Sequence, residues 1–203
     1  MEAYKIMYKI EVPYSELKPM MKYINSFLGL ACSVDMLTWK IYPNAKELSE
    51  SMGCFEALRN HIIGPPEHSP FQLNDPTVKC ICPGDGASPR TGAMVAMRSA
   101  WEVYSVDPLI KDKKEWKNIK RLNIVQKRIE DFSIEAEKAV ILAVHNHSKL
   151  IDCVKAVKNA KHISIIAIPC CVRQELYVKP DLEKFDRGIW SPQNKILIWY
   201  NIV

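Results

Sequence analysis

Six short apolar runs, separated by stretches long enough for helices, dominate the sequence from residue 78 onward. The runs are VKCIC (78–82), WEVYSV (101–106), LNIVQ (122–126), AVILAV (139–144), ISIIAI (163–168) and KILIWYNIV (195–203). Several are β-branched and apolar at nearly every position, which is typical of strands buried on both faces of a parallel sheet. The stretches 87–100, 107–121 and 147–161 suit crossover helices or helix-containing connections. This alternation predicts an α/β fold with a doubly wound, mostly parallel sheet.

A turn signal precedes the last run. Residues 191–194, SPQN, separate GIW (188–190) from KILIWYNIV, and Ser, Pro and Asn all favour turns. The pattern predicts a β-hairpin that closes the sheet edge, with residues 188–190 and the last run as its strands.

The composition changes at residues 64–77, where four of fourteen residues are proline. A stretch this rich in proline is excluded from the interior of a helix, so it predicts a connector. The segment before it, residues 1–63, has apolar residues at helical spacing in 14–30 and 44–63. Asn44 and Glu47 stand at capping-box spacing at the start of the second stretch. We expect a mainly helical N-terminal extension, with residues 4–12 compatible with either a helix or a strand.

The composition sets limits on location and partners. A chain of 203 residues with 48% hydrophobic content can bury one substantial core. The net charge of +5 permits an anionic partner such as nucleic acid without identifying one. Seven cysteines without metal-finger spacing, and a polar start without a signal peptide, predict a cytoplasmic protein with free thiols. No apolar run approaches the roughly 20 residues that span a bilayer, so we expect no membrane partner.

The residues that follow the apolar runs are the candidates for ligand binding, because a doubly wound sheet places its ligand crevice at the carboxyl ends of the strands. The glycines of the first loop permit a tight turn and close approach of a ligand to the backbone. Asp107, 21 residues beyond Gly86 and at the end of the next run, stands where ribose hydroxyls are usually held. The candidates, in chain order, are Pro83, Gly84, Asp85, Gly86, Asp107, Pro108, Ile129, Glu130, Asp131, Phe132, His145, Asn146, His147, Pro169, Cys170 and Cys171.

The loop after the first run differs from two common phosphate-binding motifs. A dinucleotide fingerprint reads G-x-G-x-x-G, whereas here Gly92 comes three positions late. Pro89 stands where a phosphate-binding helix would begin, and proline removes one of the backbone N–H groups that a pyrophosphate needs. A nicotinamide or flavin dinucleotide is therefore disfavoured. A P-loop is excluded because no Gly-Lys-Ser/Thr follows.

The series VKCICPGDGASPRTG, VYSVDP, QKRIEDF and AVILAVHNH resembles the class I S-adenosylmethionine-dependent methyltransferases. The resemblance covers residues 78–203, which would form a Rossmann-like cofactor-binding domain. The strand ends AVHNH and AIPCC are similar to a poorly characterised branch of that superfamily. The resemblance implies that Gly84 and Gly86 approach the methionine moiety and that Asp107 binds the ribose. It also implies that Ile129, with Glu130 or Asp131, lies beside the adenine, and that His145 borders the transferred methyl group.

The sequence departs from the family pattern at several positions. The family's acid ahead of the glycine loop is absent, and Cys80, Cys82 and Pro83 occupy that region, which predicts modest cofactor affinity. Arg128 stands where many members carry an acid. The fourth strand end has no Asp/Asn-Pro-Pro-aromatic sequence, so exocyclic amines of bases are not an indicated target. Ribose 2′-hydroxyl methylation does not fit either, because His145 replaces the required Asp.

His145, His147 and Cys170 are the candidate catalytic residues. Histidine ordinarily titrates near pH 6.5, so a neutral imidazole near the methyl group would act as a general base. Cys170 is alternatively a nucleophile that a histidine activates. His145, His147, Cys170 and Cys171 together have the ligand types of a zinc site, but adjacent cysteines seldom bind one ion, and we expect no metal. Each of these residues also has a purely structural interpretation.

We therefore expect a methyltransferase that uses S-adenosylmethionine and acts on an unidentified acceptor, with RNA or a small molecule as open classes. A non-catalytic module that binds nucleic acid or protein, and a zinc-bearing hydrolytic site on the same scaffold, are the alternatives. A basic cluster around Trp116 is compatible with RNA, although a solvated surface explains the same charges. The cluster comprises Lys111, Lys113, Lys114, Lys117, Lys120 and Arg121.

Overall fold

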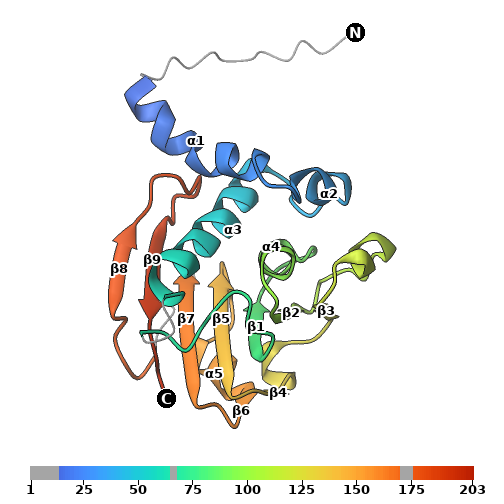
Figure 1. Cartoon of the computed structure of the whole chain (residues 1–203), viewed down its shortest axis with the longest axis vertical. Helices are drawn as coiled ribbons and strands as arrows, with labels where there is room; N and C mark the ends of the chain where they lie inside the picture. Colours follow the sequence, from blue (N-terminus) through green and yellow to red (C-terminus); the bar gives the residue numbers. More distant parts are fainter. Residues whose placement is uncertain (1–13, 65–67, 170–175) are drawn as a thin grey trace.

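A seven-stranded sheet forms the centre of the computed structural model, which describes residues 14–64, 68–169 and 176–203 and their side chains from residue 21 onward (Figure 1). The strand order is β3-β2-β1-β5-β7-β9-β8, and the first five strands in this order are parallel, whereas β9 is antiparallel to both β7 and β8. Each of the six predicted apolar runs contains one strand of this sheet, and the seventh strand, β8, lies outside the runs. The strands are β1 (Val78–Pro83), β2 (Glu102–Val106), β3 (Leu122–Val125), β5 (Lys138–Val144), β7 (His162–Ile168), β8 (Leu182–Phe185) and β9 (Lys195–Trp199).

The helices lie on the two faces of this sheet, so the predicted doubly wound fold is confirmed. In Figure 1, α3 and α4 cross one face, and α5 lies on the other. The predicted N-terminal helices are present, and the Asn44 side chain caps α3 by accepting the backbone N–H of Glu47 at 3.0 Å. The helices are α1 (Tyr14–Leu28), α2 (Ser33–Thr38), α3 (Ala45–Ala57), α4 (Arg90–Arg98) and α5 (Leu150–Lys155), and a π-helical turn, Leu58–Ile62, continues α3.

Alternate residues of each inner strand point into different cores. Cys80 of β1 and Val140 of β5 join the core under α3 and α4, whereas Ile81 and Ile141 join the core under α5. This alternation explains why the inner strands are apolar at nearly every position. The core under α3 and α4 also contains Phe27 and Phe55 from the N-terminal helices. Residues before and after the predicted connector, residues 64–77, share this core. The division of the chain into two parts at this connector stays a prediction.

The chain reverses its direction of travel across the sheet at β1. After β1 it forms β2 and β3 on one side, then returns to place β5 on the other side of β1. The register pairs Pro83 of β1 with Val106 of β2, and Val144 of β5 with Ile168 of β7. The carboxyl ends of these strands therefore meet at one edge of the sheet, where an open α/β sheet binds its ligands.

The predicted terminal hairpin is present, but one of its strands was wrong. β9 pairs with β8, and the predicted partner, residues 188–190, lies in the connection between them. Ile189 is held out of the sheet because it packs against α3 at Gly53, where an added Cβ would lie 2.7 Å from Ile189 Cγ1. β8 escaped prediction because two of its four residues are charged and its burial only alternates.

The predicted crossover at 107–121 contains one 3₁₀ turn, Lys114–Asn118, in place of a full helix. Trp116 in this turn is 1% exposed, and its indole Nε1 donates to the carbonyl oxygen of Trp39 at 3.1 Å. The turn therefore anchors the connection to the segment after α2. A second 3₁₀ turn, Ile129–Asp131, follows β3, and two short strands, β4 (Ile134–Glu135) and β6 (Val157–Lys158), form a separate two-stranded parallel sheet.

Within the described ranges, no helix combines the length and apolar character needed to cross a bilayer. Residues 4–12, which the sequence leaves open between helix and strand, lie outside those ranges.

Candidate active site

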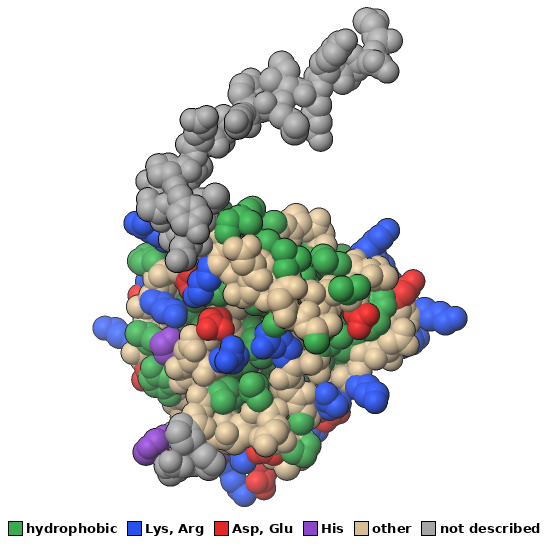
Figure 2. All heavy atoms as spheres, turned by 45° about the horizontal axis from the view of Figure 1, so that its top comes forward, with side chains coloured by type: hydrophobic (Ala, Val, Ile, Leu, Met, Phe, Trp, Pro, Cys, Tyr) green, Lys and Arg blue, Asp and Glu red, His purple; other side chains and the backbone are tan. Residues whose placement is uncertain are grey.

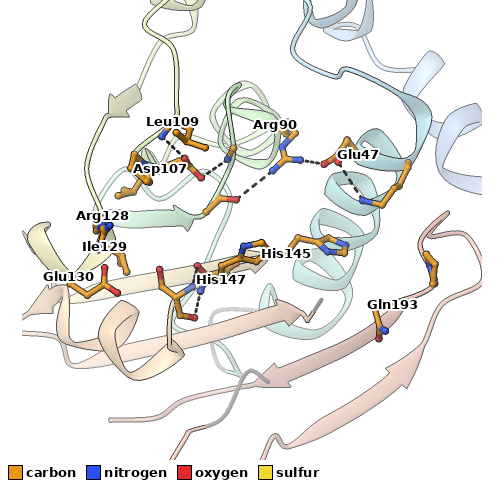
Figure 3. A pocket seen from close by; sticks show the side chains of 18 residues that line it. Glu47, Arg90, Asp107, Leu109, Arg128, Ile129, Glu130, His145, His147 and Gln193 are labelled. Carbon is orange, nitrogen blue, oxygen red and sulfur yellow. Dashed lines mark hydrogen bonds and ion pairs between the residues drawn. The ribbon is translucent and has the colours of Figure 1, made fainter. Parts of the chain in front are cut away.

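A cavity of about 880 Å³ opens at the carboxyl ends of β1, β2 and β5, where the topology predicts a ligand site (Figure 3). Its volume falls within the range of roughly 300–1,000 Å³ that is usual for small-molecule sites. The strand ends and their loops supply most of the lining, and α3, α4 and the loop before β9 complete it. The lining residues are Lys46, Glu47, Gly84, Gly86, Arg90, Val106, Asp107, Pro108, Leu109, Arg128, Ile129, Glu130, His145, Asn146, His147, Ser148, Pro192 and Gln193.

The glycine loop after β1 depends on the absence of side chains. Gly84 and Gly86 have φ values of +66° and +80°, in the left-handed region that favours glycine. A Cβ on Gly84 would lie 3.0 Å from the Cα of Asn146, which is buried in the loop after β5. The missing side chain therefore allows the loops after β1 and β5 to meet at the floor of the cavity.

Asp85 faces away from the cavity and caps α4. Its two carboxylate oxygens accept the backbone N–H groups of Thr91 (2.8 Å) and Gly92 (2.9 Å), and the Ser105 hydroxyl donates to it at 2.6 Å. Burial raises the pKa of the Asp85 carboxyl to about 6, against the lowering effect of these donors. Because Asp85 occupies these N–H groups at the start of α4, they are not directed at a ligand in the cavity.

Asp107 lines the cavity and also organises the loop around it. Its Oδ2 accepts the backbone N–H of Gly86 at 2.9 Å, and its Oδ1 accepts the N–H of Leu109 at 2.7 Å. A carboxylate has about four acceptor positions, so two acceptor positions remain beyond these bonds. The carboxylate is thus fixed in place with capacity for further donors such as hydroxyl groups.

The loop after β3 places Glu130 and Asp131, the two alternatives for the acid beside the adenine, in different positions. Ile129 and Glu130 line the main cavity, whereas Asp131 lines only a neighbouring cavity of about 450 Å³, which Ile129 and Glu130 also border. Pro108 lies in the main lining, and Pro83 does not. Arg128, noted in the sequence only as a departure, lines the main cavity as well.

The wall formed by α3 and α4 was missed by sequence reasoning. Glu47 of α3 and Arg90 of α4 form an ion pair and point toward each other in Figure 3. Arg90 Nε also donates to the carbonyl oxygen of Asp85 at 2.7 Å, which ties this wall to the glycine loop. Lys46 and Glu47 follow the Asn44 cap in the sequence, and nothing there distinguishes them from the charged first turn of any surface helix.

His145 directly follows β5, has an unusual backbone conformation and contacts α3. Its φ is +51°, its backbone N–H donates to the carbonyl oxygen of Ile168 at 2.9 Å, and its side chain is 15% exposed. The imidazole Nε2 lies 2.7 Å from Oε1 of Glu50, a residue of α3 with a fully buried side chain. His147, two residues later, also lines the cavity, so the two candidate histidines and the glycine loop border one space.

Cys170 and Cys171 lie outside the described residues. Among the residues that the structure does describe, no group of three or more His, Cys, Asp and Glu side chains has the arrangement of a metal site. The described cysteines, Cys32, Cys54, Cys80, Cys82 and Cys153, are free thiols. Cys80 and Cys82 are buried in the core, so they do not replace the family's acid ahead of the glycine loop.

Comparisons with known proteins identify related folds among solved structures. No family model matches the chain, and neither does any curated protein sequence. A mutant of the protein MtNAS in complex with S-adenosylmethionine is 11% identical, with a TM-score of 0.49 over 92% of this chain and 73% of that one. A Burkholderia thailandensis 1,6-didemethyltoxoflavin N1-methyltransferase with bound S-adenosylhomocysteine is 14% identical, with a TM-score of 0.37 over 97% of this chain and 76% of that one.

The strand order identifies the fold independently of these remote structures. Five parallel strands are followed by an antiparallel β9 that is inserted between β7 and the edge strand β8. The glycine turn follows the first strand, and Asp107 follows the second. With this strand order, and with β9 antiparallel to both of its neighbours, the chain has the fold of the class I S-adenosylmethionine-dependent methyltransferases.

Proposed function

We propose that the chain binds S-adenosylmethionine in the main cavity and transfers its methyl group to an acceptor that enters the same cavity. One observation carries the proposal: the glycine turn, the Asp107 carboxylate and the His145 side chain, from three different strand ends, border one space. A turn geometry needed only for chain reversal would not require the acid and the histidine to converge there.

The chain's own residues suit the cofactor. Gly84 and Gly86 line the cavity without side chains, which suits close approach of the methionine moiety to the backbone. Asp107 has acceptor capacity for the two ribose hydroxyls. Ile129 and Glu130 offer an apolar surface and an acceptor for the adenine, and their place in the main cavity favours Glu130 over Asp131 for that role. When bound, the cofactor supplies a methyl group on a positively charged sulfur that leaves as a neutral thioether.

His145 is the general base in this proposal. A neutral imidazole can take the proton of an acceptor hydroxyl or amine as the acceptor's lone pair attacks the methyl carbon. The walls from α3, α4 and the loop before β9 hold the acceptor in line and reduce the water around it, which supplies much of the rate enhancement. His147 borders the same space and is the second candidate for contact with the acceptor.

The acceptor is more compatible with a small molecule than with RNA bound through the basic cluster. Trp116, the aromatic residue of that cluster, is buried and is not available for base stacking. On the face in Figure 2, Lys and Arg side chains are spread among acidic and hydrophobic ones.

The free thiols of the described cysteines agree with a location in a reducing compartment such as the cytoplasm.

Calorimetric titration with S-adenosylmethionine and S-adenosylhomocysteine tests the proposal. We expect micromolar binding, and a loss of at least tenfold in affinity for Asp107→Asn, which corresponds to about 1.4 kcal/mol. Asp112→Asn is the matched control, because Asp112 lies outside the cavity lining and pairs with Lys117 at 3.1 Å. Glu130→Gln should weaken binding more than Asp131→Asn. Absence of binding to the folded wild-type protein would refute the proposal, and zinc bound in stoichiometric amount would favour the hydrolytic alternative.

A further inference from the structure

Glu50 is a fully buried carboxylate that reaches the edge of the proposed active site from the N-terminal helices. It lies in α3, and its side chain has no solvent exposure. Two nitrogen atoms converge on the same oxygen, Oε1: Lys46 Nζ at 2.8 Å and His145 Nε2 at 2.7 Å. Burial of a carboxylate costs free energy unless the group is paired and hydrogen-bonded. Packing alone therefore does not explain a glutamate at position 50.

The charges around Glu50 indicate which protonation states are present. Burial raises the pKa of the Glu50 carboxyl, but the contacts from His145 and Lys46 outweigh burial and leave the pKa below its ordinary value. Glu50 is therefore ionised at neutral pH, and Lys46 supplies the compensating positive charge. The contact of 2.7 Å between His145 Nε2 and Glu50 Oε1 places this carboxylate where it can orient the imidazole.

We propose that Glu50 is a positioning residue that holds His145 in the tautomer with its proton on Nε2, so that Nδ1 is the nitrogen that accepts the acceptor's proton. A histidine's second nitrogen is commonly fixed in this way by a carboxylate, which sets both the tautomer and the ring orientation. The inference rests on the proposed function, since it assigns His145 the part of general base. It implies an acceptor that loses a proton as it is methylated, from a hydroxyl or an N–H group.

The proton balance of this arrangement is complete within the site. The proton leaves the acceptor's oxygen or nitrogen and bonds to Nδ1, and the imidazolium that results lies against the ionised Glu50. The proton passes to solvent after the product leaves, and the imidazole is neutral again. The other charged or titratable groups that line the cavity are Glu47 and Arg90, which pair with each other, and Lys46, Asp107, Arg128, Glu130 and His147.

The test is ¹⁵N and ¹H nuclear magnetic resonance of the imidazole groups in the full chain, with His145 identified by the signals that disappear in His145→Gln. In the wild-type protein at neutral pH, we expect the His145 proton on Nε2, as a downfield, slowly exchanging signal. Glu50→Gln should remove that signal or shift it strongly upfield. Glu56→Gln is the matched control, because Glu56 lies on the same helix and pairs with Arg59. Glu56→Gln should leave the His145 signal unchanged.

Two results would overturn the inference. One is a wild-type protein with the proton of neutral His145 on Nδ1, a measurement that needs no variant to fold. The other is a His145 signal that is the same in Glu50→Gln as in the wild type. Binding of S-adenosylhomocysteine, measured on the same samples, separates this inference from the proposed function: Glu50→Gln should retain binding within about threefold. If the wild-type protein does not bind S-adenosylhomocysteine, the proposed function is refuted, whereas the result of the tautomer measurement remains valid.

Discussion

Replacement of Asp85 by Asn should remove part of the pH dependence of folding stability. The pKa of the buried carboxyl is about 6, compared with an ordinary value of 3.8. Between these two values the folded protein keeps a proton that the unfolded chain releases. The free energy of unfolding therefore falls as the pH rises from about 4 to about 6. This direction is opposite to that of a salt-bridged aspartate.

The difference of about two pH units corresponds to about 3 kcal/mol, at about 1.4 kcal/mol per unit. The wild-type protein should lose this amount between pH 4 and pH 7 through Asp85 alone, and Asp85→Asn should not. An asparagine also places an NH₂ group opposite one of the two backbone N–H donors of α4, so the variant starts less stable at pH 4. The wild-type advantage should then shrink by about 3 kcal/mol at pH 7.

Urea denaturation of both proteins at pH 4, 5, 6 and 7 measures this difference. The titrations of the remaining groups appear in both proteins and cancel when the two free energies are subtracted. A wild-type advantage that is constant, or that grows with pH, would refute the reasoning. It would show that the donors from Thr91, Gly92 and Ser105 outweigh burial and keep Asp85 ionised throughout.

Two further predictions concern the glycine loop and a surface carboxylate. Gly84→Ala should destabilise the fold by about 1–2 kcal/mol from the positive φ alone, and it should weaken S-adenosylhomocysteine binding, because the Asn146 backbone must shift. Gly29→Ala, whose Cβ would meet only ordinary contacts beginning at 3.6 Å, is the calorimetric control. Bonds from Thr77 and Lys138 lower the pKa of Asp75 to about 2, so Asp75→Asn should cost about 1 kcal/mol at pH 7. That cost should disappear as the pH falls through about 2. Urea denaturation at pH 7 and at about pH 2 measures it, and an equal cost at these two pH values would contradict the prediction.

The sheet was predictable because the hydrophobic pattern of its inner strands admits few interpretations. A run such as ISIIAI is apolar on both faces, and a helix would bury only one stripe of it. The edge strand β8 carries no such signal, because its burial only alternates: Glu183 and Phe185 are exposed, and Lys184 is charged on the partly buried face. The wrong hairpin strand had the same origin: Ile189 and Trp190 are apolar because Ile189 packs against α3, a contact that no local pattern reveals.

The floor of the candidate site was predictable for a topological reason, whereas its walls were not. Gly84, Asp107, Glu130 and His145 all follow strands, so their convergence follows from a parallel sheet. Glu50 is separated from His145 by 95 residues of sequence, and only the packing of α3 across the sheet brings them together. The alternatives that the sequence left open at Glu130 and Asp131 likewise required the geometry of one 3₁₀ turn.

The packing of α3 has a consequence for how this fold can be divided or recombined. A fragment that began at Val78 would retain every strand of the sheet and the glycine loop, yet it would expose the apolar surface that Phe27, Phe55 and their neighbours cover. The first segment could be exchanged with that of another protein only if the replacement also met Ile189 with a glycine at the position of Gly53. The N-terminal helices and the sheet therefore form one folding unit with a shared core, and we expect them to be retained together in engineered or evolved variants.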